Sequence, residues 1–372
     1  MAAPGTADEL IALVQNSGLV DKKRLSDYLA KQSSAGAMVP QEPSSLARLL
    51  VRDGILTIFQ AEQILEGKWR RFTIGRYKVL ERLGAGKQAS VYLCYDKELQ
   101  RRIAVKVLPT ARNDDSGSLE RLFRECRILA LLDHPNIVRP YDLGLDDTLH
   151  YLGMEYVEVS SLRRMTTKRG SMAVIRAAHY IRQAALGLQH YHEHAGIVHR
   201  DIKPADILVD RGGGVKIIDM GLARCSRTNQ RPLTTIYDEG VLGTPNYMAP
   251  EQVIDPHGVD IRADIYSLGA TFYFCLTGYE PIRVGTAGPK LDWQQMGPAE
   301  QGQSRPRVPA GLRALIESML ATDPFRRPQT PRQVVDALAP YTAEPIGPPP
   351  ESEMPRLSLA ALGEPPEPGT QS

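Results

Sequence analysis

Cysteine is scarce in this sequence. The 372 residues include four, namely Cys94, Cys126, Cys225 and Cys275. They are far apart and form no Cys-x-x-Cys pair, so the pattern indicates neither a zinc ribbon nor a disulfide framework. Scattered single cysteines are typical of a reducing compartment, and a cytoplasmic location is therefore expected.

Long apolar runs are also missing. The nearest candidate for a membrane span, residues 265–276, is interrupted by Ser267, Gly269 and Thr271. It is shorter than the ~18 unbroken apolar residues that a span requires, so it predicts a buried core helix. The first residues show neither the basic start nor the apolar run of a signal peptide.

Charge of either sign is not in excess. The chain has 45 Lys and Arg residues against 43 Asp and Glu, a formal net charge of +2. This is too small to suggest nucleic acid or an acidic membrane surface as an obligatory partner. The hydrophobic content of 42% is ordinary for a globular protein with a sizeable core.

The N-terminal region, residues 1–68, has the apolar spacing of helices and a faint internal repeat. Residues 13–20 and 50–57 each read as a helix end, a glycine stop and an apolar pair, and each is followed by a second helical run. Two such copies predict a small bundle. Residues 32–45, rich in Gln, Ser, Gly and Pro, are expected to link them.

The pattern changes between residues 74 and 340. Strand-like runs occur at residues 77–83, 90–94, 102–108, 137–143 and 150–156. A helix is expected at residues 119–132, and the signal is mainly helical after Leu162. Strands followed by helices predict an α+β protein in two lobes.

Proline dominates the chain beyond residue 340. It occurs at positions 345, 348, 349, 350, 355, 365, 366 and 368. This density predicts a disordered tail over residues 340–372. A polyproline ligand at residues 348–350 is the alternative interpretation.

The first motif that could carry chemistry is a glycine turn between two expected strands. Gly84 and Gly86 would let backbone amides approach a triphosphate, although Ala89 stands where a third glycine is expected. Lys106 follows inside an apolar strand, where burial is costly unless the amine meets negative charge. Glu125 in the next helix could supply that charge. Taken singly, Lys106 is better explained as a snorkelling lysine and Glu125 as a solvated glutamate.

The second motif is His-Arg-Asp-Ile-Lys-Pro at residues 199–204. Asp201 could orient a substrate hydroxyl and accept its proton, and Lys203 could reach a transferred phosphoryl group. Asp206 is placed to bind a metal ion. Asp219 follows an apolar run and could hold Mg²⁺ against phosphates.

A third group of residues lies further along the chain. Residues 243–251 end at Glu251, which could pair with Arg327. Asp264 opens the apolar helix noted above, where it could cap the helix N-terminus or hold nearby backbone.

In this order and spacing the motifs resemble those of the Hanks-type Ser/Thr protein kinases, especially the bacterial eukaryotic-like branch. The resemblance implies a two-lobed protein kinase fold over residues 77–338. Its N-lobe, residues 77–154, would hold a sheet and one helix, and its C-lobe, residues 158–338, would be mainly helical.

The resemblance also implies residue roles. Lys106 would bind the α- and β-phosphates of ATP and pair with Glu125. Asp201 would be the catalytic base, with Lys203 beside it. The ATP-binding set would comprise Leu83, Gly84, Gly86, Val91, Ala104, Lys106, Glu125, Glu155, Val157 and Leu208. The metal ligands would be Asp206 and Asp219, for Mg²⁺ or for Mn²⁺ in its place.

The implied activity is ATP-dependent transfer of the γ-phosphate to a Ser or Thr hydroxyl of a protein, because Lys203 and Thr244 match the Ser/Thr pattern. Arg200, directly before Asp201, marks family members whose activation loop is ordered by phosphorylation. We therefore expect autophosphorylation at Thr234 or Thr235.

Asp206 departs from the family, which usually has asparagine there. Aspartate keeps an oxygen ligand, loses the NH₂ donor and adds negative charge near Asp201 and Asp219. A pseudokinase, or a weakly active nucleotide-binding scaffold, is therefore the alternative. A small-molecule phosphotransferase is disfavoured by the motif at residues 243–251. The N-terminal helices could dock on the kinase core, recruit a protein partner or form a dimer contact.

Overall fold

The structure, a computed structural model, describes residues 2–34, 39–85, 90–108, 132–147, 149–196, 198–218, 245–255, 258–283, 289–291, 293, 308–355 and 358. The chain divides into two compact units. The first comprises Met1–Arg112, Pro140–Tyr156 and Arg356–Ser372, and the second comprises Asn113–Arg139 and Val157–Pro355.

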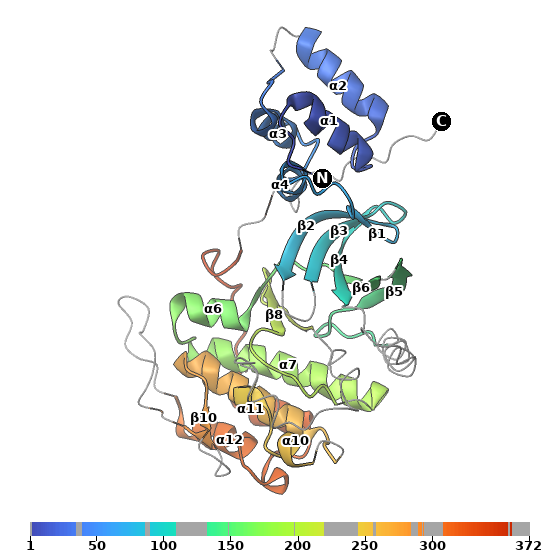
Figure 1. Cartoon of the computed structure of the whole chain (residues 1–372). Helices are drawn as coiled ribbons and strands as arrows, with labels where there is room; N and C mark the ends of the chain where they lie inside the picture. The colour runs from blue at the N-terminus through green and yellow to red at the C-terminus, as the bar shows by residue number, and fades with distance from the viewer. Residues whose placement is uncertain are drawn as a thin grey trace. The chain divides into compact units, whose positions relative to one another are not determined.

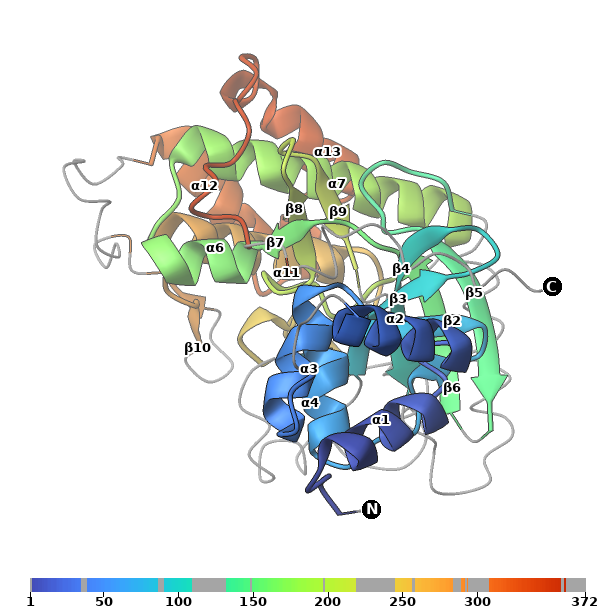
Figure 2. The ribbon, with the colours of Figure 1, turned by 90° about the horizontal axis from the view of Figure 1, so that it is seen from above.

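Four helices open the first unit: α1 (Ala7–Asn16), α2 (Lys22–Ser34), α3 (Pro43–Arg52) and α4 (Ile58–Leu65) (Figure 2). Gly18 lies between α1 and α2, and Gly54 lies between α3 and α4. Both glycines have left-handed backbone, with φ of 67° and 69° respectively. An L side chain rarely adopts this conformation, so glycine allows the tight reversal. The predicted repeat is therefore present, with a shorter link than expected, because α2 continues to Ser34.

The rest of the first unit is a six-stranded antiparallel sheet in the order β1-β2-β3-β4-β6-β5 (Figure 1). Its strands are β1 (Thr73–Ile74), β2 (Tyr77–Ala85), β3 (Ser90–Asp96), β4 (Arg101–Leu108), β5 (Pro140–Asp146) and β6 (Leu149–Glu155). One face carries a core that includes Val79, Cys94 and Val105, against which Phe59 of α4 packs. The N-terminal helices therefore dock on this sheet.

The second unit is mainly helical, which together with the sheet confirms the expected α+β class. Its strands are β7 (Val159–Ser161), β8 (Ile207–Asp210), β9 (Val215–Ile217), β10 (Ile282–Arg283) and β11 (Pro289–Lys290). Its helices are α6 (Leu162–Arg169), α7 (Val174–Ala195), α10 (Glu251–Ile254), α11 (Arg262–Thr277), α12 (Ala310–Met319) and α13 (Pro331–Ala337), with short 3₁₀ turns η1 (Pro245–Tyr247), η2 (Pro324–Arg326) and η3 (Ala339–Tyr341).

Helix α11 is the centre of the second unit's core, as the apolar run predicted. All of its residues from Ala263 to Thr277 are buried, and it contacts both α7 and α12. In the parts of the chain that the structure describes, no helix is long and apolar enough to cross a membrane.

The strand expected at residues 137–143 is wrong at its start. Ile137 forms a parallel bridge with Ile217 of β9, and Val138 donates to the Ile217 carbonyl over 3.0 Å. Its partner is thus distant in sequence, and strand β5 begins only at Pro140.

The first part of the proline-rich tail is ordered against the second unit, which differs from the predicted disorder. Proline-rich backbone leaves its carbonyls without regular partners, and cationic side chains of α6 and α7 supply donors here. Lys168 donates to the Ser352 carbonyl over 2.6 Å, and Arg176 to the Pro348 carbonyl over 3.4 Å. Met354 is buried.

Candidate active site

One face of the first unit's sheet brings together four residues of the predicted ATP-binding set. Val91 on β3 lies opposite Gly84 on β2 and Lys106 on β4. Residues directly opposite one another in an antiparallel pair share a face, as do residues two apart in a strand. Ala104 therefore lies on this face too. The core containing Phe59 occupies the other face.

Lys106 is a buried lysine, with 7% of its surface exposed. An ammonium group is stable in such a place only when negative charge or hydrogen-bond acceptors compensate for lost water.

The other described residues of the predicted ATP-binding set lie on several elements. Leu83 and Gly84 are exposed at the end of β2, and Glu155 is the last residue of β6. Val157 comes two residues after Glu155, and Leu208 lies in β8.

The residues around Asp201 form a charged cluster in the second unit. The Lys203 ammonium donates to Asp201 Oδ2 over 2.7 Å and lies 3.3 Å from Asp206 Oδ2. Burial by itself would lower the pKa of Lys203, but the carboxylates of Asp206 and Asp201 outweigh it, so the pKa is raised. Lys203 is therefore a cation held between two carboxylates at neutral pH.

The loop that carries Asp201 is held in place by Asp264. The fully buried carboxylate accepts a bond from the His199 amide over 2.8 Å and another from the Arg200 amide over 2.7 Å. Arg200 has φ 64°, a left-handed conformation that is costly for a residue with a Cβ. Of the two roles expected for Asp264, the structure shows the holding of backbone.

Gln252 supports the same loop, and the sequence motifs gave no hint of it. Its side-chain amide donates to the Arg200 carbonyl over 2.9 Å, and its oxygen accepts from the Ala249 amide over 3.0 Å. Both backbone groups of Arg200 are thus bonded to side chains. The only signal in the sequence is a polar residue directly after Glu251.

Glu251 and Arg327, which the sequence predicts to pair, are in contact. Two guanidinium nitrogens of Arg327 lie 2.6 and 2.8 Å from the two carboxylate oxygens of Glu251. The Arg327 side chain is fully buried, and its other donors bond the carbonyls of Ala321, Arg262 and Thr322. This two-pronged pair joins α10 to the segment before α13.

Several predicted site residues lie outside the described residues: Gly86, Glu125, Asp219, Thr234 and Thr235. No group of three metal-ligating side chains occurs among the described ones. Asp206 nevertheless offers what Mg²⁺ prefers, because carboxylate oxygens are hard ligands. The described residues can therefore provide a base, a fixed cation and one metal ligand.

Comparisons with known proteins agree with this chemistry. Residues 77–338 match the model of the family described as "Protein kinase domain". The chain is 35% identical to the serine/threonine-protein kinase PrkC of Bacillus subtilis, over 69% of this chain and 39% of that protein. It is 37% identical to the serine/threonine-protein kinase PknB of Mycolicibacterium smegmatis, over 68% of this chain and 41% of that protein.

A solved structure is similar as well. The crystal structure of the Mycobacterium tuberculosis PknI kinase domain, in a mutant form, superimposes with a TM-score of 0.57 at 26% identity, covering 72% of this chain and 96% of that one. The chain matches only about two fifths of the length of PrkC and PknB. The names of these relatives favour a kinase over the alternative, a pseudokinase or nucleotide-binding scaffold, that the aspartate at position 206 suggested.

Proposed function

Because this chain belongs to the bacterial Hanks-type Ser/Thr protein kinase family, we propose that it transfers the γ-phosphate of ATP to Ser or Thr hydroxyls of protein substrates in the cytoplasm. The observation that carries the proposal is the cluster of Asp201, Lys203 and Asp206 on a loop whose backbone Asp264 fixes.

Asp201 is assigned as the catalytic base in this proposal. Its carboxylate would accept the proton of the attacking hydroxyl and orient that oxygen towards phosphorus. The bonds from the His199 and Arg200 amides to Asp264 support this role, because they fix the backbone next to Asp201. A base that is already positioned needs no reorganisation during the reaction.

Lys203 is assigned to the charge that develops on the transferred group. Its raised pKa keeps the ammonium protonated, and the contact with Asp201 holds it beside the base. A fixed cation in a half-buried site stabilises a phosphoryl group more strongly than a cation in water does.

The nucleotide is assigned to the exposed end of β2 and the sheet face with Val91, Ala104 and Lys106, together with Glu155, Val157 and Leu208. Lys106 would bond the α- and β-phosphates. Asp206 and Asp219 would hold Mg²⁺, which when bound neutralises phosphate charge. Glu125 would pair with Lys106, and autophosphorylation would occur at Thr234 or Thr235.

Two measurements test the proposal. The purified chain is incubated with γ-labelled ATP, Mg²⁺ and a general protein substrate, and the phosphoamino acids are separated. We expect phosphoserine or phosphothreonine and no phosphotyrosine. Site mapping of the chain itself should find phosphate on Thr234 or Thr235; if both are unmodified in active protein, the activation-loop assignment is wrong.

A further inference from the structure

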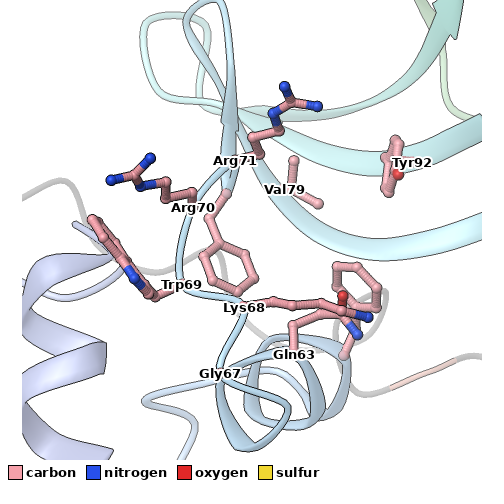
Figure 3. A pocket seen from close by; sticks show the side chains of 10 residues that line it. Gln63, Gly67, Lys68, Trp69, Arg70, Arg71, Val79 and Tyr92 are labelled. Carbon is pink, nitrogen blue, oxygen red and sulfur yellow. The ribbon is translucent and has the colours of Figure 1, made fainter. Parts of the chain in front are cut away.

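A pocket of about 600 Å³ lies in the first unit (Figure 3). Val79 and Tyr92, which line it, belong to the sheet face opposite the one that carries Lys106. It is formed by α4, the connector that follows this helix, and strands β2 and β3. Its lining combines aromatic and cationic side chains: Phe59, Trp69, Tyr92, Lys68, Arg70 and Arg71. Aromatic walls with cations beside them suit a ligand that has flat apolar groups and negative charge.

The cations of this pocket are not fully compensated by the described parts of the chain. Lys68 contacts Glu66 over 2.6 Å. Arg70 stacks over the Trp69 ring at 4.8 Å from its centroid, but no described carboxylate forms an ion pair with Arg70 or Arg71. Arg70 and Arg71 are neighbours in the chain and both are exposed, so their two positive charges together would stabilise an anionic ligand here.

The backbone at the pocket is also unusual. Arg71 has φ 67°, in the left-handed region that a residue with a Cβ rarely adopts. Such conformations are energetically unfavourable and are concentrated at binding and catalytic sites. Arg71 lies in the connector between Arg70 and the buried Phe72, and all three residues line the pocket.

The chain itself contains a segment with the complementary chemistry. Residues 359–372 include Glu364 and Glu367 and no lysine or arginine. Proline at positions 365, 366 and 368 favours the polyproline II helix, which has three residues per turn. In that helix the two glutamates would share one edge, and Pro365 and Pro368 the next. Proline-rich segments of this kind bind in aromatic-lined grooves.

The structure also shows where this segment starts. The Ser358 hydroxyl donates to the carboxylate of Glu81 on β2, two residues along the strand from Val79, which lines the pocket. Glu364 is six residues beyond Ser358, and six residues of fully extended chain reach at most about 20 Å. A segment tethered so close has an effective concentration in the mM range, so weak contacts suffice for binding.

We propose that residues 364–368 of this chain bind in the pocket, with Glu364 and Glu367 paired to Arg70 and Arg71 and the prolines packed on the aromatic rings. The bound segment would connect the N-terminal helices to strands β2 and β3 through a second set of contacts. The proposal is independent of phosphoryl transfer, because none of these residues is assigned to that reaction.

Competition with a free peptide tests this. A fluorescent peptide of residues 359–372 is titrated into the full-length chain and into the full-length variant Glu364→Lys/Glu367→Lys. We expect the variant to bind the peptide at least about tenfold more tightly, because its own segment no longer occupies the pocket. Adding Arg70→Glu/Arg71→Glu to the variant should abolish binding, whereas Lys22→Glu/Lys23→Glu on α2 should leave it unchanged.

Three results would overturn the proposal. These are equal peptide binding by the wild-type chain and the tail variant, no binding to either, and binding that survives reversal of Arg70 and Arg71. A fourth result would also overturn it: if a phosphopeptide of unrelated sequence binds the wild-type chain as well as the tail variant, the chain's own segment does not occupy the pocket. Carbodiimide cross-linking of the wild-type chain should also join Lys68 to Glu364 or Glu367, independently of protein concentration.

Discussion

The side-chain amide of Gln60 donates to the carbonyl oxygen of Val79 over 2.6 Å, and this bond fixes α4 to strand β2. Gln60 is buried and also accepts from the Thr57 amide, completing a capping box at the start of α4. The bond falls where the β2–β3 register shifts between Val79 and Glu81. One glutamine therefore both begins the helix and docks it.

Gln60→Glu separates these two roles. Glutamate can still cap Thr57, but it has no NH₂ group to donate and places negative charge against the Val79 carbonyl. We expect a loss of about 1–3 kcal/mol in the free energy of unfolding, measured by urea titration. Glu62→Gln, on the exposed side of α4, is the matched control and should change stability by less than about 0.5 kcal/mol. Equal effects of the two substitutions would contradict the docking role.

Arg327→Lys tests the contact with Glu251. Lysine cannot form the two parallel bonds or reach the carbonyls that Arg327 also satisfies, so Glu251 would be left partly unpaired. We expect a loss of roughly 3–5 kcal/mol of stability. Arg326→Lys, at an exposed neighbouring position, is the control. If thermal unfolding finds both variants close to wild type, this pair is not a main stabilising contact of the second unit.

Lys78 provides a prediction about pH. Its ammonium donates to the Leu19 carbonyl over 2.7 Å. Burial, with smaller contributions from Lys97 and Arg24, lowers its pKa to about 8, from 10.5 in the unfolded chain. Between these values the unfolded chain holds a proton that the folded chain lacks, so stability increases as pH rises from 8 to 10.5.

Lys78→Met removes this titrating group. Between pH 8 and 10.5 we expect the free energy of unfolding of the wild type to increase relative to that of the variant as pH rises. Lys31→Met is a control because Lys31 lies at an exposed site on α2 and does not contribute to the lowered pKa of Lys78. If the difference in the free energy of unfolding between wild type and Lys78→Met is constant from pH 8 to 10.5, the Lys78 pKa is not lowered.

Asp206→Asn tests how this position serves catalysis. Asparagine keeps an oxygen ligand and removes one negative charge, while Asp201 still pairs with Lys203. We expect turnover to be preserved or raised, with a changed dependence on Mg²⁺ and Mn²⁺. Asp206→Ala, which removes the ligand, should lower turnover roughly tenfold or more. Loss of turnover in a folded Asp206→Asn protein would contradict our assignment of this residue.

Much of the fold could be predicted from local sequence patterns. Strands β2, β3, β4 and β6 follow their apolar alternation, and α11 follows its unbroken apolar run, because burial of one face or of all faces leaves a local signature. Gly18 and Gly54 indicated the two helix ends for the same local reason.

The errors came from contacts between distant residues. Ile137 pairs with Ile217, 80 positions away, and no local pattern records that partner. The tail's composition predicted disorder, yet Lys168 and Arg176 bind its carbonyls. Gln252 was missed because only the folded chain brings it to the Arg200 carbonyl.

The central claim is that Asp201 serves as the base of a protein kinase. The most direct measurement is the rate of γ-phosphate transfer from labelled ATP to protein by the wild-type chain and by Asp201→Asn. Asparagine keeps the shape of the side chain and removes the proton acceptor, so the rate should fall by roughly 10²–10⁴-fold in a protein that remains folded. Equal rates for the two proteins, or no transfer by the wild type with either metal ion, would contradict the claim.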